Sequence, residues 1–219
     1  MSERRSGGSS PLRVVLAVLV VVVAVVGVAV ALVVLVDDSV PADDRVLVGG
    51  DSVTYQSVQE LGESLGWAGD GLKVVGVPGN RTDQIEASIR PEFDDGPPGV
   101  VVVIAGYNDL LQRFDPEPAV RSLMELVGGA PCAVWVLVPT KGDWDPAGAV
   151  AYDDLVTRQA AEHRRVHVEP AWRDAVDAPA GPDPDPALVD TDQVHPTEAG
   201  QARLAEIVAA AVERDCGRR

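Results

Sequence analysis

The sequence predicts an α/β domain in which crossover helices cover a parallel sheet of five strands, preceded by one transmembrane helix. Beyond residue 45, apolar runs of strand length alternate with stretches of helical length, which is typical of a parallel sheet. One run, Val100–Ile104, is β-branched throughout, as expected for a strand covered on both faces. An uncharged run over residues 14–36 precedes the domain and is long enough to cross a bilayer.

The composition excludes several classes of protein. The 219 residues include 18 basic and 34 acidic side chains, for a net charge of −16. Proteins that bind nucleic acid neutralise phosphates with clustered Lys and Arg, so no nucleic-acid partner is expected. Hydrophobic residues make up 46% of the chain, which excludes collagen-like and wholly disordered proteins. We therefore expect a folded core.

The uncharged run over residues 14–36 consists of Val, Leu and Ala, broken only by Gly27. As a helix it spans roughly 34 Å, enough for a hydrocarbon core of about 30 Å. A cleaved signal peptide, which would release a secreted domain, is the alternative, but its apolar stretch is usually about 7–15 residues long. We expect an uncleaved anchor in the lipid bilayer.

The flanking charges orient this anchor. Arginines precede the run and aspartates follow it, so the positive-inside rule keeps residues 1–13 in the cytoplasm. Residues 37–44 then form an acidic tether, and residues 45–219 form a domain outside the cytoplasm.

The elements of this domain follow from apolar patterning. Strands are predicted over 45–48, 72–77, 100–105, 133–138 and 166–168, and helices over 53–65, 82–89, 118–127, 149–163 and 196–214. Pro196 suits the first position of the last helix, where no backbone donor is needed. Residues 170–188 are rich in Pro, Ala and Asp without clear periodicity, which predicts a long surface loop.

Ligands of such sheets bind at the carboxyl ends of the strands, so the segments that follow the predicted strands are candidates for the active site. Ser52 follows the first strand in Gly50-Asp51-Ser52, at a turn into a helix. An ordinary turn with an N-cap is the alternative. Asp192 and His195 lie together just before the last helix, and a histidine oriented by an acid can activate a serine.

Two other segments contain hydrogen-bond donors. Gly79 follows the second strand and Asn108 follows the third. The negative charge that develops on a carbonyl oxygen during acyl transfer requires fixed donors of this type. Each segment alone is ordinary turn chemistry, but their joint placement around one sheet favours a catalytic site.

The four segments together resemble the blocks of the SGNH (GDSL-type) hydrolase family over about residues 45–213. The matching segments are Gly50-Asp51-Ser52, Gly79, Gly106-Tyr107-Asn108-Asp109 and Asp192-Gln193-Val194-His195, in the family's order. The resemblance implies a flavodoxin-like three-layer α/β/α sandwich with Ser52 as nucleophile, His195 as base and Asp192 as the orienting acid. It also implies an oxyanion hole made by the amides of Ser52 and Gly79 and the side chain of Asn108.

We therefore expect a membrane-anchored serine esterase that needs no metal or cofactor. Its partner would be a small-molecule or glycan ester of the envelope or the extracellular space, from which it removes an acyl or acetyl group. Transfer of the acyl group to an envelope glycan, or a lysophospholipase or thioesterase activity, would use the same acyl-enzyme. A non-catalytic module that binds a glycan or protein is the alternative from another class.

Two tryptophans and two cysteines complete the candidates. Trp144 and Trp172 follow the fourth and fifth strands, where an exposed ring could stack on a sugar or acyl chain; capping of the core is the alternative.

Cys132 starts a strand and Cys216 ends a helix that runs the opposite way, so both reach the same end of the domain. In an oxidising compartment, a disulfide between them would contribute roughly 4–5 kcal/mol.

Overall fold

The computed structural model describes residues 44–66 and 71–218. The predicted anchor over residues 14–36 lies outside these ranges, as does the tether apart from Asp44. Within the described ranges, no helix combines the length and apolar character that a membrane span requires.

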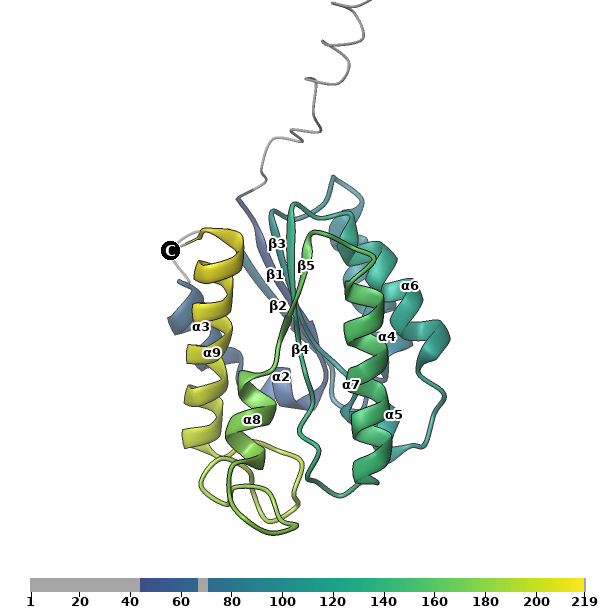
Figure 1. Cartoon of the computed structure of the whole chain (residues 1–219). Coiled ribbons are helices and arrows are strands. Elements are labelled where there is room, and N and C mark those ends of the chain that lie inside the picture. The colour runs from purple at the N-terminus through teal and green to yellow at the C-terminus, as the bar shows by residue number, and fades with distance from the viewer. Residues whose placement is uncertain (1–43, 67–70, 219) are drawn as a thin grey trace, which may run out of the picture. The chain divides into compact units, whose positions relative to one another are not determined.

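A parallel five-stranded sheet forms the centre of the domain (Figure 1), as the sequence predicts. Its strands are β1 (Val46–Gly50), β2 (Leu72–Gly76), β3 (Val100–Ile104), β4 (Cys132–Val136) and β5 (Val166–Glu169). They are hydrogen-bonded in the order β2-β1-β3-β4-β5. Every residue of β1, β3 and β4 is buried, because these central strands are apolar on both faces and helices cover each face.

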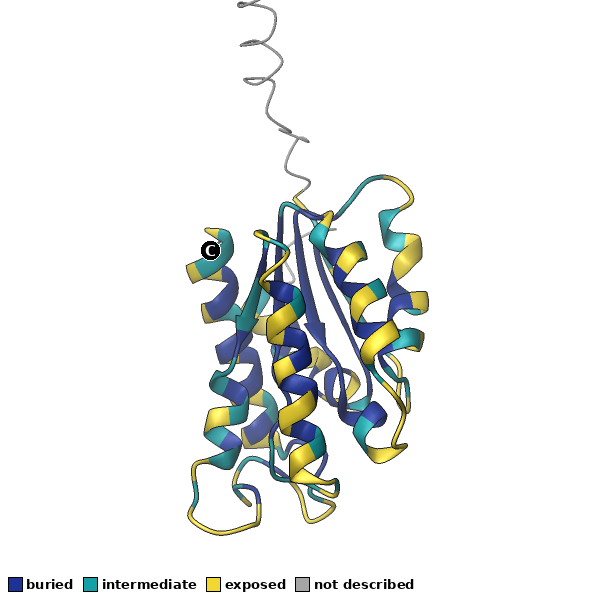
Figure 2. Cartoon of the chain, turned by 45° about the vertical axis from the view of Figure 1, so that its right-hand side comes forward, coloured by how far each residue is buried: buried dark blue, intermediate teal, exposed yellow. Residues whose placement is uncertain are grey.

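Helices form a layer on each face of the sheet. The layer on one side contains α3 (Val58–Leu65), α8 (Ala171–Asp177) and α9 (Glu198–Cys216), and the other contains α4 (Thr82–Ile89), α6 (Glu117–Gly128) and α7 (Pro146–Ala160). Figure 2 shows the buried residues of the helices turned toward the strands and the exposed ones turned outward. This arrangement is the expected three-layer sandwich.

Several elements differ from the predicted ones. The predicted helix over 53–65 is two helices, α2 (Ser52–Gln56) and α3, that meet at Ser57. The Ser57 hydroxyl donates to the carbonyl oxygen of Val53 at 2.9 Å, a local bond that competes with continuation of the helix. The short helices α5 (Tyr107–Leu111) and η1 (Arg90–Phe93) were not predicted, because one turn gives too little periodicity to recognise.

The predicted loop over 170–188 was wrong in its first part. Helix α8 occupies residues 171–177, and its residues Trp172 and Val176 are buried at a spacing of one turn. A seven-residue helix between prolines and aspartates has a weak local pattern, and its packing against the domain stabilises it.

Cys132 and Cys216 form a disulfide with a Cα–Cα distance of 5.6 Å. The bond joins the first residue of β4 to the last residue of α9. It therefore lies at the amino ends of the strands, the edge of the sheet opposite the carboxyl ends.

Candidate active site

The turn between β1 and α2 places Ser52 at the carboxyl edge of the sheet. Asp51 caps α2, since its Oδ1 accepts the backbone N–H of Val53 at 3.0 Å. Gly50 has no room for a side chain: a Cβ there would lie 1.9 Å from the Oγ1 atom of Thr54 and 2.6 Å from the carbonyl oxygen of Ile104. Glycine is thus required for the strand to turn directly into the helix that begins with Ser52.

The loop before α9 brings His195 to this serine. The Nε2 atom of His195 lies 2.9 Å from the Oγ atom of Ser52, although the two residues are 143 positions apart in the chain. The Nδ1 atom of His195 lies 2.6 Å from Oδ2 of Asp192. Ser52, His195 and Asp192 are therefore connected by hydrogen bonds, in the order that a serine nucleophile, its base and an orienting acid require.

Asp192 is also bound to the backbone of its own loop. Its Oδ1 accepts the N–H groups of Val194 and His195, each at 2.9 Å. Slight burial acts to raise the pKa of Asp192, but the hydrogen bonds from His195 and Val194 outweigh it and lower that pKa below its ordinary value. The ionised Asp192 carboxylate accepts a hydrogen bond from the Nδ1–H group of His195. With the proton on Nδ1, Nε2 is the acceptor for the Ser52 hydroxyl.

The other two sequence candidates follow strands that neighbour β1. Gly50 is paired with Gly76 of β2 and with Ile104 of β3, so the chain leaves all three strands side by side. Gly79 has φ = 82°, in the left-handed region that favours glycine. Within the described part of the chain, neither the Gly79 N–H nor the Ser52 N–H donates a hydrogen bond to another residue. Both amides are thus available to a ligand.

Asn108 is held by Asp51. Its Nδ2 atom donates to the Asp51 Oδ2 at 3.0 Å, and both residues are buried. A carboxamide nitrogen has two hydrogens, so one remains for a ligand. Asp51 was not singled out from the sequence, although it lies within the motif that contains Ser52, because its partner is distant in the chain.

Burial raises the pKa of Asp51 from an ordinary value of 3.8 to about 7, against the lowering effect of the hydrogen bonds from Val53 and Asn108.

A second carboxylate, Asp109, fixes the start of α5. Its Oδ2 accepts from the N–H and the hydroxyl of Thr82 at 2.9 and 2.8 Å, which joins α5 to the first turn of α4.

The two tryptophan candidates differ in the structure. Trp172 is only 1% exposed, and its Nε1 donates to the hydroxyl of Tyr107 at 2.7 Å. The expectation that Trp172 contacts substrate is therefore wrong, because α8 directs this ring into the core. Trp144 is partly buried, packs edge-on against Tyr107 with ring centroids 5.7 Å apart, and retains a surface in contact with solvent.

Among the residues that the structure describes, there is no group of three or more His, Cys, Asp or Glu side chains that could hold a metal ion. The chemistry available to this arrangement is that of a serine hydroxyl beside a histidine, with backbone and carboxamide N–H donors close by.

Comparison with known proteins shows a family match. Residues 48–203 match the model of the GDSL-like lipase/acylhydrolase family. No curated protein sequence matches the chain significantly.

Several solved structures share the fold. A GDSL-like lipase from Bacteroides thetaiotaomicron is 18% identical with a TM-score of 0.62, and the match covers 83% of this chain and 93% of the lipase. A lipase/acylhydrolase from Enterococcus faecalis is 17% identical with a TM-score of 0.61, covering 78% and 95% of the two chains. An acetylxylan esterase from Geobacillus stearothermophilus is 20% identical with a TM-score of 0.56, covering 80% and 94%.

Proposed function

The chain belongs to the GDSL-like lipase/acylhydrolase family and is a serine hydrolase that acts on ester bonds, and we propose that it removes a small acyl group through Ser52, His195 and Asp192. The observation that carries the assignment is the distance of 2.9 Å between the Ser52 Oγ and the His195 Nε2. The fold neighbour that is an acetylxylan esterase supports a small acyl group carried by a sugar.

The proposed reaction proceeds through an acyl-enzyme. The Ser52 Oγ attacks the acyl carbonyl carbon while its proton passes to the His195 Nε2. The negative charge on the carbonyl oxygen is stabilised by the N–H groups of Ser52 and Gly79 and by the free hydrogen of the Asn108 carboxamide. The bond to the alcohol oxygen then breaks, and the alcohol leaves with the proton from His195.

A water molecule completes the cycle. It attacks the acyl-enzyme as His195 takes one of its protons, and the acid is released when that proton returns to the Ser52 oxygen. The His195 side chain is 30% exposed and that of Asp192 is 50% exposed, so water can reach the site. This access favours hydrolysis over transfer of the acyl group to an envelope glycan.

We also propose that the domain acts outside the cytoplasm, anchored by residues 14–36. The length and lack of charge of this run support an anchor, and the arginines before it support a cytoplasmic N-terminus. The disulfide between Cys132 and Cys216 supports the location, because such bonds persist in oxidising compartments.

The proposal is tested with the purified full-length chain and a ladder of p-nitrophenyl esters from acetyl to octanoyl. We expect turnover that favours the shortest chains and that Ser52→Ala abolishes. Ser64→Ala, which removes an exposed serine of α3, is the matched control and keeps full activity. A fluorophosphonate probe should add one label to the wild-type protein and none to Ser52→Ala. Equal turnover or equal labelling of both proteins would contradict the role of Ser52.

A further inference from the structure

A pocket of about 950 Å³ lies beside the candidate active site, at the upper end of the range of about 300–1,000 Å³ that is typical of ligand pockets. Residues 109–111 and 113–117, which follow β3, line one side. The loop 142–145 after β4 and one face of α7 line the other side. Ser52, Asp192 and His195 do not line this pocket. Asp109, which does line it, directly follows Asn108 in the chain.

Two aromatic rings give the pocket apolar surfaces. Phe114 is 42% exposed, and the guanidinium of Arg81, which does not line the pocket, covers one face of its ring at 4.4 Å from the centroid. The other ring is Trp144, whose Nε1 donates to the carbonyl oxygen of Pro139 at 3.2 Å. Ring faces of this kind pack against the C–H groups of a sugar, and they require little ordering when they are already fixed.

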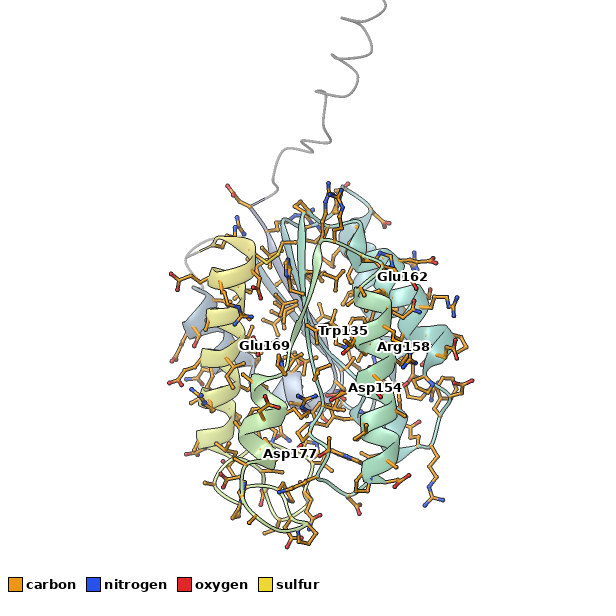
Figure 3. The ribbon with its side chains drawn as sticks, in the orientation of Figure 1. Trp135, Asp154, Arg158, Glu162, Glu169 and Asp177 are labelled. Atoms are coloured by element: carbon orange, nitrogen blue, oxygen red, sulfur yellow. A yellow bond between two sulfur atoms is a disulfide. The ribbon has the colours of Figure 1, made fainter. Side chains whose placement is uncertain are left out.

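The loop that contains Trp144 is itself fixed. The Asp177 carboxylate, labelled in Figure 3, accepts from the N–H and hydroxyl of Thr140 at 2.9 and 2.7 Å and from the N–H of Lys141 at 3.1 Å. The pocket is therefore formed before any ligand binds.

The charged groups of the pocket select among ligands. Its lining contains five carboxylates, Asp109, Asp115, Glu117, Asp143 and Asp145, and two guanidiniums, Arg113 and Arg158. Arg158 lies on α7 (Figure 3). The excess of negative charge disfavours an anionic ligand. A fatty acyl chain would remove water from these charged groups without replacing their hydrogen bonds, which is unfavourable.

Hydroxyl groups match the charged groups at the pocket surface. Four of the five carboxylates, all except the buried Asp109, and both guanidiniums are exposed. A hydroxyl group of a ligand can donate to these carboxylates and accept from the guanidiniums.

We propose that this pocket binds neutral sugar units in the alcohol part of the ester, so that the substrate is an O-acylated oligosaccharide. The proposal rests on the esterase function proposed above. Rigid ring faces match the C–H faces of the sugar, while the surrounding carboxylates and guanidiniums match its hydroxyl groups.

The test is a substitution that fills the pocket. Ala151 is an exposed residue of α7 that lines the pocket, whereas Thr157 is exposed on the same helix and does not line it. Full-length Ala151→Trp and its matched control Thr157→Trp are assayed on O-acetylated xylohexaose and chitohexaose, and on p-nitrophenyl acetate and octanoate. Ala151→Trp should raise the KM for the oligosaccharide that the wild-type protein prefers by about tenfold or more. Its turnover of p-nitrophenyl acetate should be unchanged. Thr157→Trp should change neither the oligosaccharide KM nor the turnover of p-nitrophenyl acetate.

A binding measurement separates this proposal from the esterase function. By titration calorimetry, the same hexasaccharides without O-acetyl groups should bind to Ser52→Ala. Their affinity should fall by about tenfold in Ser52→Ala/Ala151→Trp. Binding of neither sugar, an unchanged KM in Ala151→Trp, or a loss confined to the octanoyl ester would overturn the sugar site. Absence of p-nitrophenyl acetate turnover in the wild-type protein would instead contradict the proposed esterase, whatever the calorimetry shows.

Discussion

The carboxamide of Asn108 donates a hydrogen bond of 3.0 Å to the carboxylate of Asp51, the residue directly before Ser52. Asn108, which follows β3, is thereby fixed to the turn that contains the candidate nucleophile Ser52. Since Asp51 also caps α2 through the N–H of Val53, one buried carboxylate orients both the helix that begins with Ser52 and the side chain of Asn108.

Removing this carboxylate should reduce turnover without weakening substrate binding. In Asp51→Ala, Asn108 loses its fixed partner and points its remaining hydrogen less accurately, so we expect kcat to fall by about tenfold to a hundredfold. KM for p-nitrophenyl acetate should change little. Steady-state kinetics beside Asp154→Ala, an exposed position of α7, checks this prediction. A rise in KM at constant kcat would assign Asp51 to binding instead.

The same residue should make stability depend on pH. Asp51 has a pKa of about 7 in the folded protein against an ordinary value of 3.8, so between these values the folded state retains a proton that the unfolded state loses. The contribution of Asp51 to the free energy of unfolding is therefore complete below about pH 4 and decreases as the pH rises toward 7, by an amount on the order of 4 kcal/mol.

Urea unfolding of the wild-type protein and of Asp51→Asn between pH 4 and pH 8 measures this effect. The stability of the wild-type protein relative to Asp51→Asn should decrease across that range. A difference that stays constant with pH would show that Asp51 titrates in the folded protein as it does in the unfolded chain.

Asp192→Asn should impair the chemical step. The uncharged carboxamide no longer favours the histidine tautomer that accepts a proton from Ser52, so kcat should fall by about a hundredfold to ten-thousandfold. The neighbouring exposed Asp190→Asn is the control and should keep most activity. If both variants retained full turnover of p-nitrophenyl acetate, Asp192 would not be the residue that orients His195.

The disulfide should stabilise the domain without taking part in catalysis. It closes a long loop between residues 84 positions apart, so Cys132→Ala/Cys216→Ala should lower the free energy of unfolding by roughly 4–5 kcal/mol. Since the bond lies at the opposite edge of the sheet from Ser52, kcat/KM at low temperature should be unchanged. Urea unfolding and ester kinetics measure both. Two reactive thiols in the unreduced wild-type protein, or unchanged stability of the variant, would contradict the prediction.

Several features could be predicted from the sequence because their signal is local. The five strands were identified to within two residues at each end, since an apolar run such as Val100–Ile104 has few alternatives to a buried strand. The segments that contain Ser52, Gly79, Asn108 and His195 were recognisable because each has its own short pattern in a loop. The proximity of Cys132 and Cys216 followed from the directions of a strand and a helix.

Other features depend on partners that are distant in the chain, and no local pattern specifies them. Whether Trp172 faces solvent or the core depends on where α8 packs. The bond between Asp51 and Asn108 crosses 57 positions of sequence, and the pocket beside it forms only where the segments after β3 and β4 face each other. Local residue patterns thus specified the strands and the reactive groups, whereas burial and the pairing of distant side chains arose from the packing of helices on the sheet.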